Sequence, residues 1–189
     1  MNRYSPSKSL YRRCLGRHWY ELDLDSNRYQ RKAASPEDVQ PAPSAADVKR
    51  DLQAHVYHAQ PSLALLGPFL GACRKARKLA AHPMRFIFDA VSAHIERATF
   101  YHDEISRDEV FYRCAAYRRL TAMRLRQPLC LEASLGALYF LPRPHPDLTL
   151  CIGVRPEPFL AHAWLELDGV VLNDSLRRVE DYKEICVIK

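Results

Sequence analysis

Three residues in the last third of the chain carry groups that together perform nucleophilic chemistry in proteins: Cys130, His162 and Asp174. A thiol becomes a nucleophile when its pKa is lowered, when a base takes its proton, and when a third group orients that base. Imidazole is the usual base, and a carboxylate is a common orienting group. The three residues therefore make a candidate Cys-His-Asp triad.

Cys130 stands at the start of a predicted helix that extends to about Leu141 and ends before Pro142 and Pro144. Unpaired N–H groups and the positive end of the helix dipole favour a thiolate at this place. The chain has six cysteines and eight histidines, so the presence of a Cys and a His proves nothing by itself. The usual role of a cysteine in a reduced protein is to fill the core, and only its position singles out Cys130.

His162 and Asp174 fall on two neighbouring predicted strands. Opposed residues of an antiparallel hairpin have a constant index sum, so this pair opposes directly only if the loop has an odd number of residues. We therefore predict a three-residue loop, Leu167 to Gly169, with Gly169 left-handed in a bulge. The two Cβ atoms would then lie on the order of 5 Å apart. Asp168 is expected to be a turn residue that points away from His162, and a purely structural His162–Asp174 pair is the alternative.

Other kinds of chemical site lack their signatures in this sequence. No Cys-x-x-Cys or His-x-x-x-His pair occurs, and His55 and His58 lack companion ligands. Only six glycines are present, and none of them forms a phosphate-binding loop. We therefore expect neither a metal nor a cofactor.

The order of predicted elements indicates an α+β fold. Residues 62–127 follow a helical pattern, interrupted at Pro61, Pro68 and Pro83, and apolar residues form two stripes. The first stripe is Phe86, Phe88, Val91, Ile95 and Phe100, and the second is Val110, Phe111, Cys114, Tyr117, Leu120 and Met123. Four strands follow at 148–154, 161–167, 170–173 and 184–189, the first of them apolar enough to be buried on both faces.

The first 60 residues predict a small unit of their own. Alternation from His18 to Leu24, a turn and a return through Arg28 to Lys32 indicate a hairpin. Residues 35–46 have the proline-rich composition of a linker. Ser44 and Asp47 then have capping-box spacing, which predicts a helix that extends to about Ala59.

The net charge of +6 is unevenly distributed: residues 61–129 carry +6, residues 1–60 carry +3, and residues 130–189 carry −3. The basic side of the second stripe is formed by Arg107, Arg113, Arg118, Arg119, Arg124 and Arg126. We interpret it as a solvated helix face rather than a phosphate-binding surface, and expect no nucleic-acid partner.

The N-terminus has no apolar signal region and no apolar stretch could span a bilayer, so we expect a cytoplasmic protein without membrane insertion.

Several stretches in the right order resemble the C-terminal domain of lasso peptide leader peptidases. These are the B proteins of lasso peptide biosynthesis, a branch of the transglutaminase-like cysteine hydrolases. The resemblance is carried by residues 148–155, 158–164 and 169–174, and residues 130–135 resemble the segment that holds the family's nucleophile. It is strong from Cys130 to the C-terminus and extends back to about Pro61.

The resemblance implies a papain-like half-core at 61–189, in which a helix delivers Cys130 to a sheet that carries His162 and Asp174. The implied reaction is proteolysis of a ribosomally made precursor peptide through a thioester, after which a separate ATP-using cyclase acts on the released core. Backbone N–H groups at the helix start, and the side chain of Gln127, are candidate oxyanion donors. Residues 1–60 would be a leader-recognition element that adds the leader to an exposed sheet edge.

Two other functions use the same residues differently. An acyltransferase of transglutaminase or amine N-acetyltransferase type shares the triad, and differs only in the nucleophile that resolves the thioester. A non-enzymatic adaptor would bind peptide through its basic helices and use Cys130 as a core residue.

Overall fold

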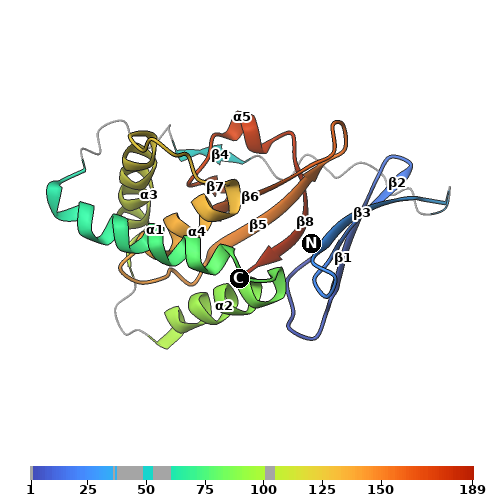
Figure 1. Cartoon of the computed structure of the whole chain (residues 1–189), viewed down its shortest axis with the longest axis horizontal. Helices are drawn as coiled ribbons and strands as arrows, with labels where there is room; N and C mark the ends of the chain where they lie inside the picture. Colours follow the sequence, from blue (N-terminus) through green and yellow to red (C-terminus); the bar gives the residue numbers. More distant parts are fainter. Residues whose placement is uncertain (1, 36, 38–48, 53–60, 101–104) are drawn as a thin grey trace.

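The computed structural model describes residues 2–35, 37, 49–52, 61–100 and 105–189. A three-stranded sheet comes first in this part of the chain, a helical stretch follows, and a second sheet ends it (Figure 1). The predicted α+β class is confirmed. No helix among these residues is long and apolar enough to cross a membrane.

The first sheet has the order β1-β2-β3 and is antiparallel throughout. Its strands are β1 Leu10–Leu15, β2 His18–Asp23 and β3 Arg28–Ala33. The predicted hairpin corresponds to β2 and β3, whereas β1 was not predicted. Tyr11 is the one fully buried residue of β1, and Arg12 and Arg13 follow it, so the strand shows no apolar alternation in the sequence.

The helix predicted from Ser44 to Ala59 is wrong at residues 50 and 51, and the rest of it lies mainly outside the described residues. Arg50–Asp51 forms the short strand β4, which pairs in parallel with β7, Val170–Val171. The Lys49 ammonium pairs with the buried carboxylate of Glu166 and the half-buried carboxylate of Glu184 in the second sheet, and Leu52 is buried. These tertiary contacts override the local spacing that favours a helix. The predicted linker also lies mostly outside the described part.

The predicted helical stretch contains α1 Leu66–Ala80, α2 Met84–Glu96 and α3 Arg107–Ala122, with 3₁₀ turns at Leu63–Leu65 and Arg97–Phe100. Pro68 does not interrupt the helix, because it occupies the first turn of α1, where its missing N–H costs no hydrogen bond. Phe86 is 52% exposed, and its neighbour Ile87 faces the core instead. Met123 is likewise exposed rather than part of its stripe.

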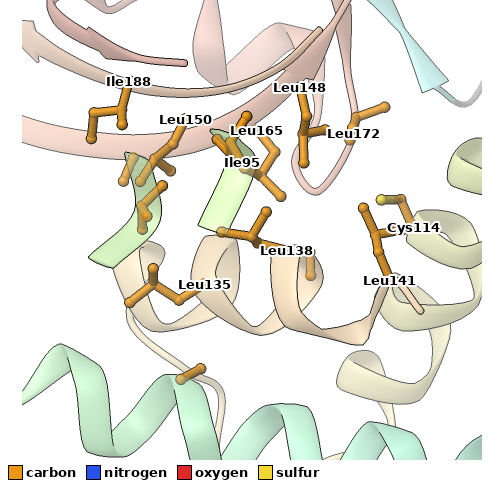
Figure 2. Close-up of a cluster of buried hydrophobic side chains, with 14 of the residues drawn as sticks. Ile95, Cys114, Leu135, Leu138, Leu141, Leu148, Leu150, Leu165, Leu172 and Ile188 are labelled. Carbon is orange, nitrogen blue, oxygen red and sulfur yellow. The ribbon is translucent and has the colours of Figure 1, made fainter. Parts of the chain in front are cut away.

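The second sheet has the order β4-β7-β6-β5-β8, with β5 Leu148–Arg155, β6 Leu160–Leu167 and β8 Lys183–Ile188. Neighbouring strands in this sheet are antiparallel, except that β4 and β7 pair in parallel. Helix α4, Cys130–Phe140, packs on one face, and Leu138 points from it toward the leucines of the strands (Figure 2), while Leu135 of the same helix is also fully buried. The short helix α5, Leu176–Val179, connects β7 to β8.

The two sheets share one hydrophobic core. Tyr11, Tyr20 and Leu22 of the first sheet belong to the same buried cluster as Leu135 of α4 and Leu150 of β5. Figure 1 shows the first sheet beside β8, close to the N-terminus. Backbone hydrogen bonds from the Tyr4 N–H to the Val187 carbonyl, and from the Val187 N–H to the Asn2 carbonyl, fix the start of the chain there.

Candidate active site

Cys130 is the first residue of α4, as predicted from the sequence. Leu129 precedes it in an extended conformation and offers no capping side chain, so the N–H groups of the first turn stay available to the thiol. The half-buried sulfur forms hydrogen bonds with the His162 side chain and with the backbone of Leu131 and Ala163. Donors from the helix start and from β6 thus surround the thiol.

His162 lies on β6 and is 7% exposed. Its Nε2 is 2.7 Å from Oδ2 of Asp174, which leaves Nδ1 for the hydrogen bond with the Cys130 sulfur. The ring packs against Tyr182, at 4.9 Å between centroids, and against Trp164, at 6.0 Å. These rings restrict the imidazole to the orientation in which one nitrogen faces the thiol and the other faces the carboxylate.

The structure brings Asp174 to His162, but the predicted three-residue loop is wrong. Asp168 and Gly169 form a two-residue turn with φ of 51° and 75°, and Leu167 pairs with Val170. In that register a regular strand places Asp174 on the face of the sheet opposite to His162. Because β7 ends at Val171, the chain leaves the ladder and carries Asp174 to His162 from the bend before α5.

The electrostatics favour a charged thiolate–imidazolium pair. Burial raises the pKa of Cys130, but the hydrogen bond and charge of His162 and the two backbone bonds outweigh it, so the pKa lies below that of an ordinary thiol. Burial lowers the pKa of His162, whereas its bonds to Asp174 and Cys130 raise it to about 9. Burial raises the pKa of Asp174, but the hydrogen bonds from His162 and from the Ser175 N–H outweigh this effect and lower the pKa below its usual value.

Four of the other cysteines show the opposite shift. Burial raises the pKa of Cys73, raises those of Cys114 and Cys186 to about 12, and raises that of Cys151 well above its ordinary value. These thiols remain neutral near pH 7 and serve as core groups. The contrast singles out Cys130 as the candidate nucleophile among these five cysteines.

The first sheet supplies a wall beside the thiol. Tyr29 of β3 lies close enough to Cys130 for the thiolate charge to contribute to the raised pKa of its phenol, after the larger effect of burial. Its ring packs edge-on against Phe159 at 6.4 Å between centroids, and Tyr20 stacks on the same residue at 5.6 Å. Phe159 directly precedes β6, so the aromatic group lies next to the strand that carries His162.

Two other expectations about side chains near the site are corrected or refined. The Gln127 amide donates to the carbonyls of Thr121 and Arg124 at the end of α3, so it is occupied and does not serve as an oxyanion donor. Asp168 occupies the turn as expected, and Arg107 binds it at 2.9 Å.

The basic face of α3 and of the loop after it is largely engaged within the protein. Arg113 binds Glu109, Arg126 binds Glu132, and Arg124 contacts the Cys73 sulfur. With Arg107 on Asp168, four of the six arginines of this face have identified intramolecular partners.

One group of side chains has the composition of a metal site: Cys151, Glu166 and Glu184, whose ligand atoms lie within 4.8 Å of one another. The Lys49 ammonium binds both carboxylates, and the Trp164 indole N–H donates to Glu166. Because the ammonium already supplies the positive charge, the group fits an internal ion pair that attaches the segment at residue 49 to the sheet.

Two polar residues beside the triad were missed by sequence reasoning, namely Ser134 and Asn173. Ser134 lies one helical turn after Cys130, and Asn173 directly precedes Asp174. A serine within a helix and an asparagine after a strand are common, so residue type carried no signal. The one available signal was their spacing, one helical turn after Cys130 and one residue before Asp174, and it was not used.

Comparison with known proteins agrees with this geometry. The model of the transglutaminase-like superfamily matches residues 78–187, which is more than half of the chain and includes Cys130, His162 and Asp174. No curated protein and no solved structure gives a significant match. The chain belongs to the transglutaminase-like superfamily.

Proposed function

We propose that this protein is a cysteine endopeptidase that removes the leader from a ribosomally made lasso peptide precursor. The observation that carries the proposal is the hydrogen-bonded chain from the Cys130 sulfur through the two nitrogens of His162 to Asp174. The superfamily is commonly one of cysteine peptidases or acyltransferases, which agrees with a thiolate nucleophile. The resemblance at residues 130–135, 148–155, 158–164 and 169–174 supports the lasso precursor as substrate.

In the first half of the reaction the Cys130 thiolate attacks the carbonyl carbon of the scissile peptide bond. An S–C bond forms, and the carbonyl oxygen becomes an oxyanion that the N–H groups at the start of α4 stabilise. His162 then gives its proton to the leaving nitrogen, and the C–N bond breaks. The products are the core peptide with a free amine and a thioester between the leader and Cys130.

In the second half a water molecule attacks the thioester. His162 takes a proton from the water, the S–C bond breaks, and the thiolate–imidazolium pair is restored. The leader leaves as a carboxylic acid, which ionises by losing its proton to the solvent. Asp174 stays ionised throughout, holds Nε2 of the imidazole and stabilises its positive charge.

The proposed leader-binding surface is the outer edge of β3. Among the described residues no strand pairs with this edge, and Arg28 and Arg31 give it positive charge, whereas Lys32 pairs with Glu21. An extended peptide that adds to the edge would pass near Tyr29, whose side chain lies beside Cys130. The proposed partner is a lasso cyclase, which uses ATP to act on the released core.

The proposed place of reaction is the reducing cytoplasm, which suits a protein with six free cysteines.

The test is to incubate the full chain with the precursor peptide encoded beside it, with and without a primary amine, and to identify the products by mass spectrometry. We expect a leader that ends in a free carboxylate under both conditions. A leader amide formed with the added amine would identify an acyltransferase. An uncut precursor that is nevertheless bound would support the adaptor function and contradict the proposal.

A further inference from the structure

Ser134 and Asn173 meet at a point where all three segments of the triad come together. Ser134 Oγ is fully buried, 2.9 Å from the Cys130 carbonyl and 2.9 Å from the Ala163 carbonyl. Asn173 Nδ2 lies 3.0 Å from the same oxygen. One hydroxyl therefore contacts the helix turn that begins with Cys130, the residue after His162, and the residue before Asp174.

The single proton of the Ser134 hydroxyl determines which of its three hydrogen bonds it donates and which it accepts. A serine hydroxyl donates one proton and accepts up to two, so Ser134 accepts from Asn173 Nδ2 while its own proton is shared between the carbonyls of Cys130 and Ala163. A bond to the carbonyl four residues earlier is common for serine in a helix. The bond to Ala163 is the one that joins α4 to β6.

Ala163 is attached to α4 through both of its backbone groups. Its N–H is a hydrogen-bond partner of the Cys130 sulfur, and its carbonyl accepts from Ser134. The spacing between these two bonds is fixed by one turn of α4, from Cys130 to Ser134. Because His162 directly precedes Ala163, these two bonds also set the position of the Cys130 sulfur relative to His162.

Asn173 replaces a bond that the β6–β7 ladder lacks. Leu172 donates its N–H to the Leu165 carbonyl at 2.9 Å, and in a regular ladder the Leu165 N–H would return to the Leu172 carbonyl. It donates instead to Asn173 Oδ1 at 2.7 Å. The asparagine side chain therefore satisfies β6 after the backbone has left the ladder, and this departure is what brings Asp174 to the side of His162.

We propose that Ser134 and Asn173 are a positioning pair that sets the geometry of Cys130, His162 and Asp174. The pair holds the helix start against β6 and keeps the chain out of the ladder at the residue before Asp174. This inference rests on the proposed function only in that it assigns the pair a role in catalysis. The placement of the three side chains is a property of the folded chain, and it is measurable without a substrate.

The experiment measures the rate of Cys130 alkylation by iodoacetamide against pH, by peptide mass spectrometry on the full chain. We expect Ser134→Ala and Asn173→Ala to raise the midpoint by about one pH unit, which is about a tenfold loss of thiolate at pH values below both midpoints. Ser134→Thr keeps a hydroxyl at this position, and we expect its midpoint to stay near that of the wild type.

The matched control is Ser92→Ala in α2. Ser92 is also buried, and its hydroxyl bonds Glu96 and the Lys189 carbonyl, away from the triad. Its loss should lower the melting temperature without moving the midpoint. If Ser134→Ala does not fold, Asn173→Ala decides, because Asn173 is only half-buried.

Folded Ser134→Ala or Asn173→Ala proteins with the wild-type midpoint would overturn the inference, as would an equal shift in Ser92→Ala. Cleavage assays separate this outcome from failure of the proposed function. For the positioning role we expect a lower kcat with little change in KM. A wild-type protein that leaves the precursor uncut refutes the peptidase, while the alkylation midpoints still decide on the pair.

Discussion

At the scale of single residues, the thiol of Cys130 and the imidazole of His162 titrate as one coupled pair. The pKa of His162 is raised from 6.5 to about 9, so its contribution to stability is complete below about pH 6.5 and is lost as the pH rises through about 9. The pKa of Cys130 is lowered, so the contribution of the thiolate is present above the ordinary thiol pKa and is lost as the pH falls through the lowered value. The charged pair therefore persists between these two limits.

Selective alkylation checks the lowered pKa of Cys130. At pH 7 we expect iodoacetamide to modify Cys130 before Cys73, Cys114, Cys151 and Cys186, because their pKa values are raised by burial. The order of modification is read by peptide mass spectrometry. His162→Ala removes the stabilising partner and should slow Cys130 specifically. Earlier modification of one of those four thiols would show that Cys130 is not the activated cysteine.

Asp174→Asn tests the carboxylate. An asparagine cannot stabilise the imidazolium, so the pKa of His162 should fall from about 9 toward 6.5, and the alkaline limit of activity should move to lower pH. Turnover should fall by about 10²-fold or more, by analogy with other triads. NMR titration of the His162 ring measures the first effect and precursor cleavage the second. An unchanged His162 titration would remove Asp174 from the site.

At the scale of elements, the sequence predicts α4, β5 and β6 well because each has a strong local pattern: a helix start followed by prolines, or a long apolar stretch. The β6–β7 connection was predicted wrongly because both His162 and Asp174 were assumed to remain on strands. Asp168 and Gly169 are a strong signal for a two-residue turn, and the structure follows it. Along the route of Asp174, Asn173 bonds Ser134, two residues that are distant from each other in sequence, and no local pattern encodes this contact.

Gly169→Ala tests that turn. The residue has φ of 75°, and no atom lies within 4 Å of where a Cβ would be, so the cost is backbone strain alone. We expect the free energy of unfolding to fall by about 1 kcal/mol in urea denaturation. Gly71→Ala is the control, because Gly71 is exposed within α1 and also has open space around it; it should stabilise by about 0.5–1 kcal/mol. An unchanged stability in Gly169→Ala would contradict the left-handed turn.

At the scale of the whole molecule, the described part of residues 1–60 shares its core with the rest of the chain and supplies Tyr29 to the site. Sequence patterns suggested an appended unit because hydrophobic alternation reports burial but not the partner. The same limit applies to charge. Four of the six arginines of the basic helical face pair with acids or sulfur within the protein, which the sequence could not show.

Removal of residues 1–60 is therefore expected to damage the fold itself. The chain from Pro61 onward would lose Tyr11, Tyr20, Leu22 and Leu24 from the core. We expect it to lose cooperative thermal unfolding and to bind a hydrophobic dye in near-physiological buffer. Circular dichroism and dye fluorescence measure both effects. A truncated chain that melts cooperatively at the temperature of the full chain would show instead that the first sheet is a separate unit.

The most direct test of the account is the rate of precursor cleavage by the wild-type chain and by Cys130→Ala, measured side by side by mass spectrometry. Cys130 supplies the nucleophile, so the account predicts that the wild type cuts the precursor, and that the variant stays folded and loses activity by at least about 10³-fold. Cleavage by Cys130→Ala at the wild-type rate would contradict it.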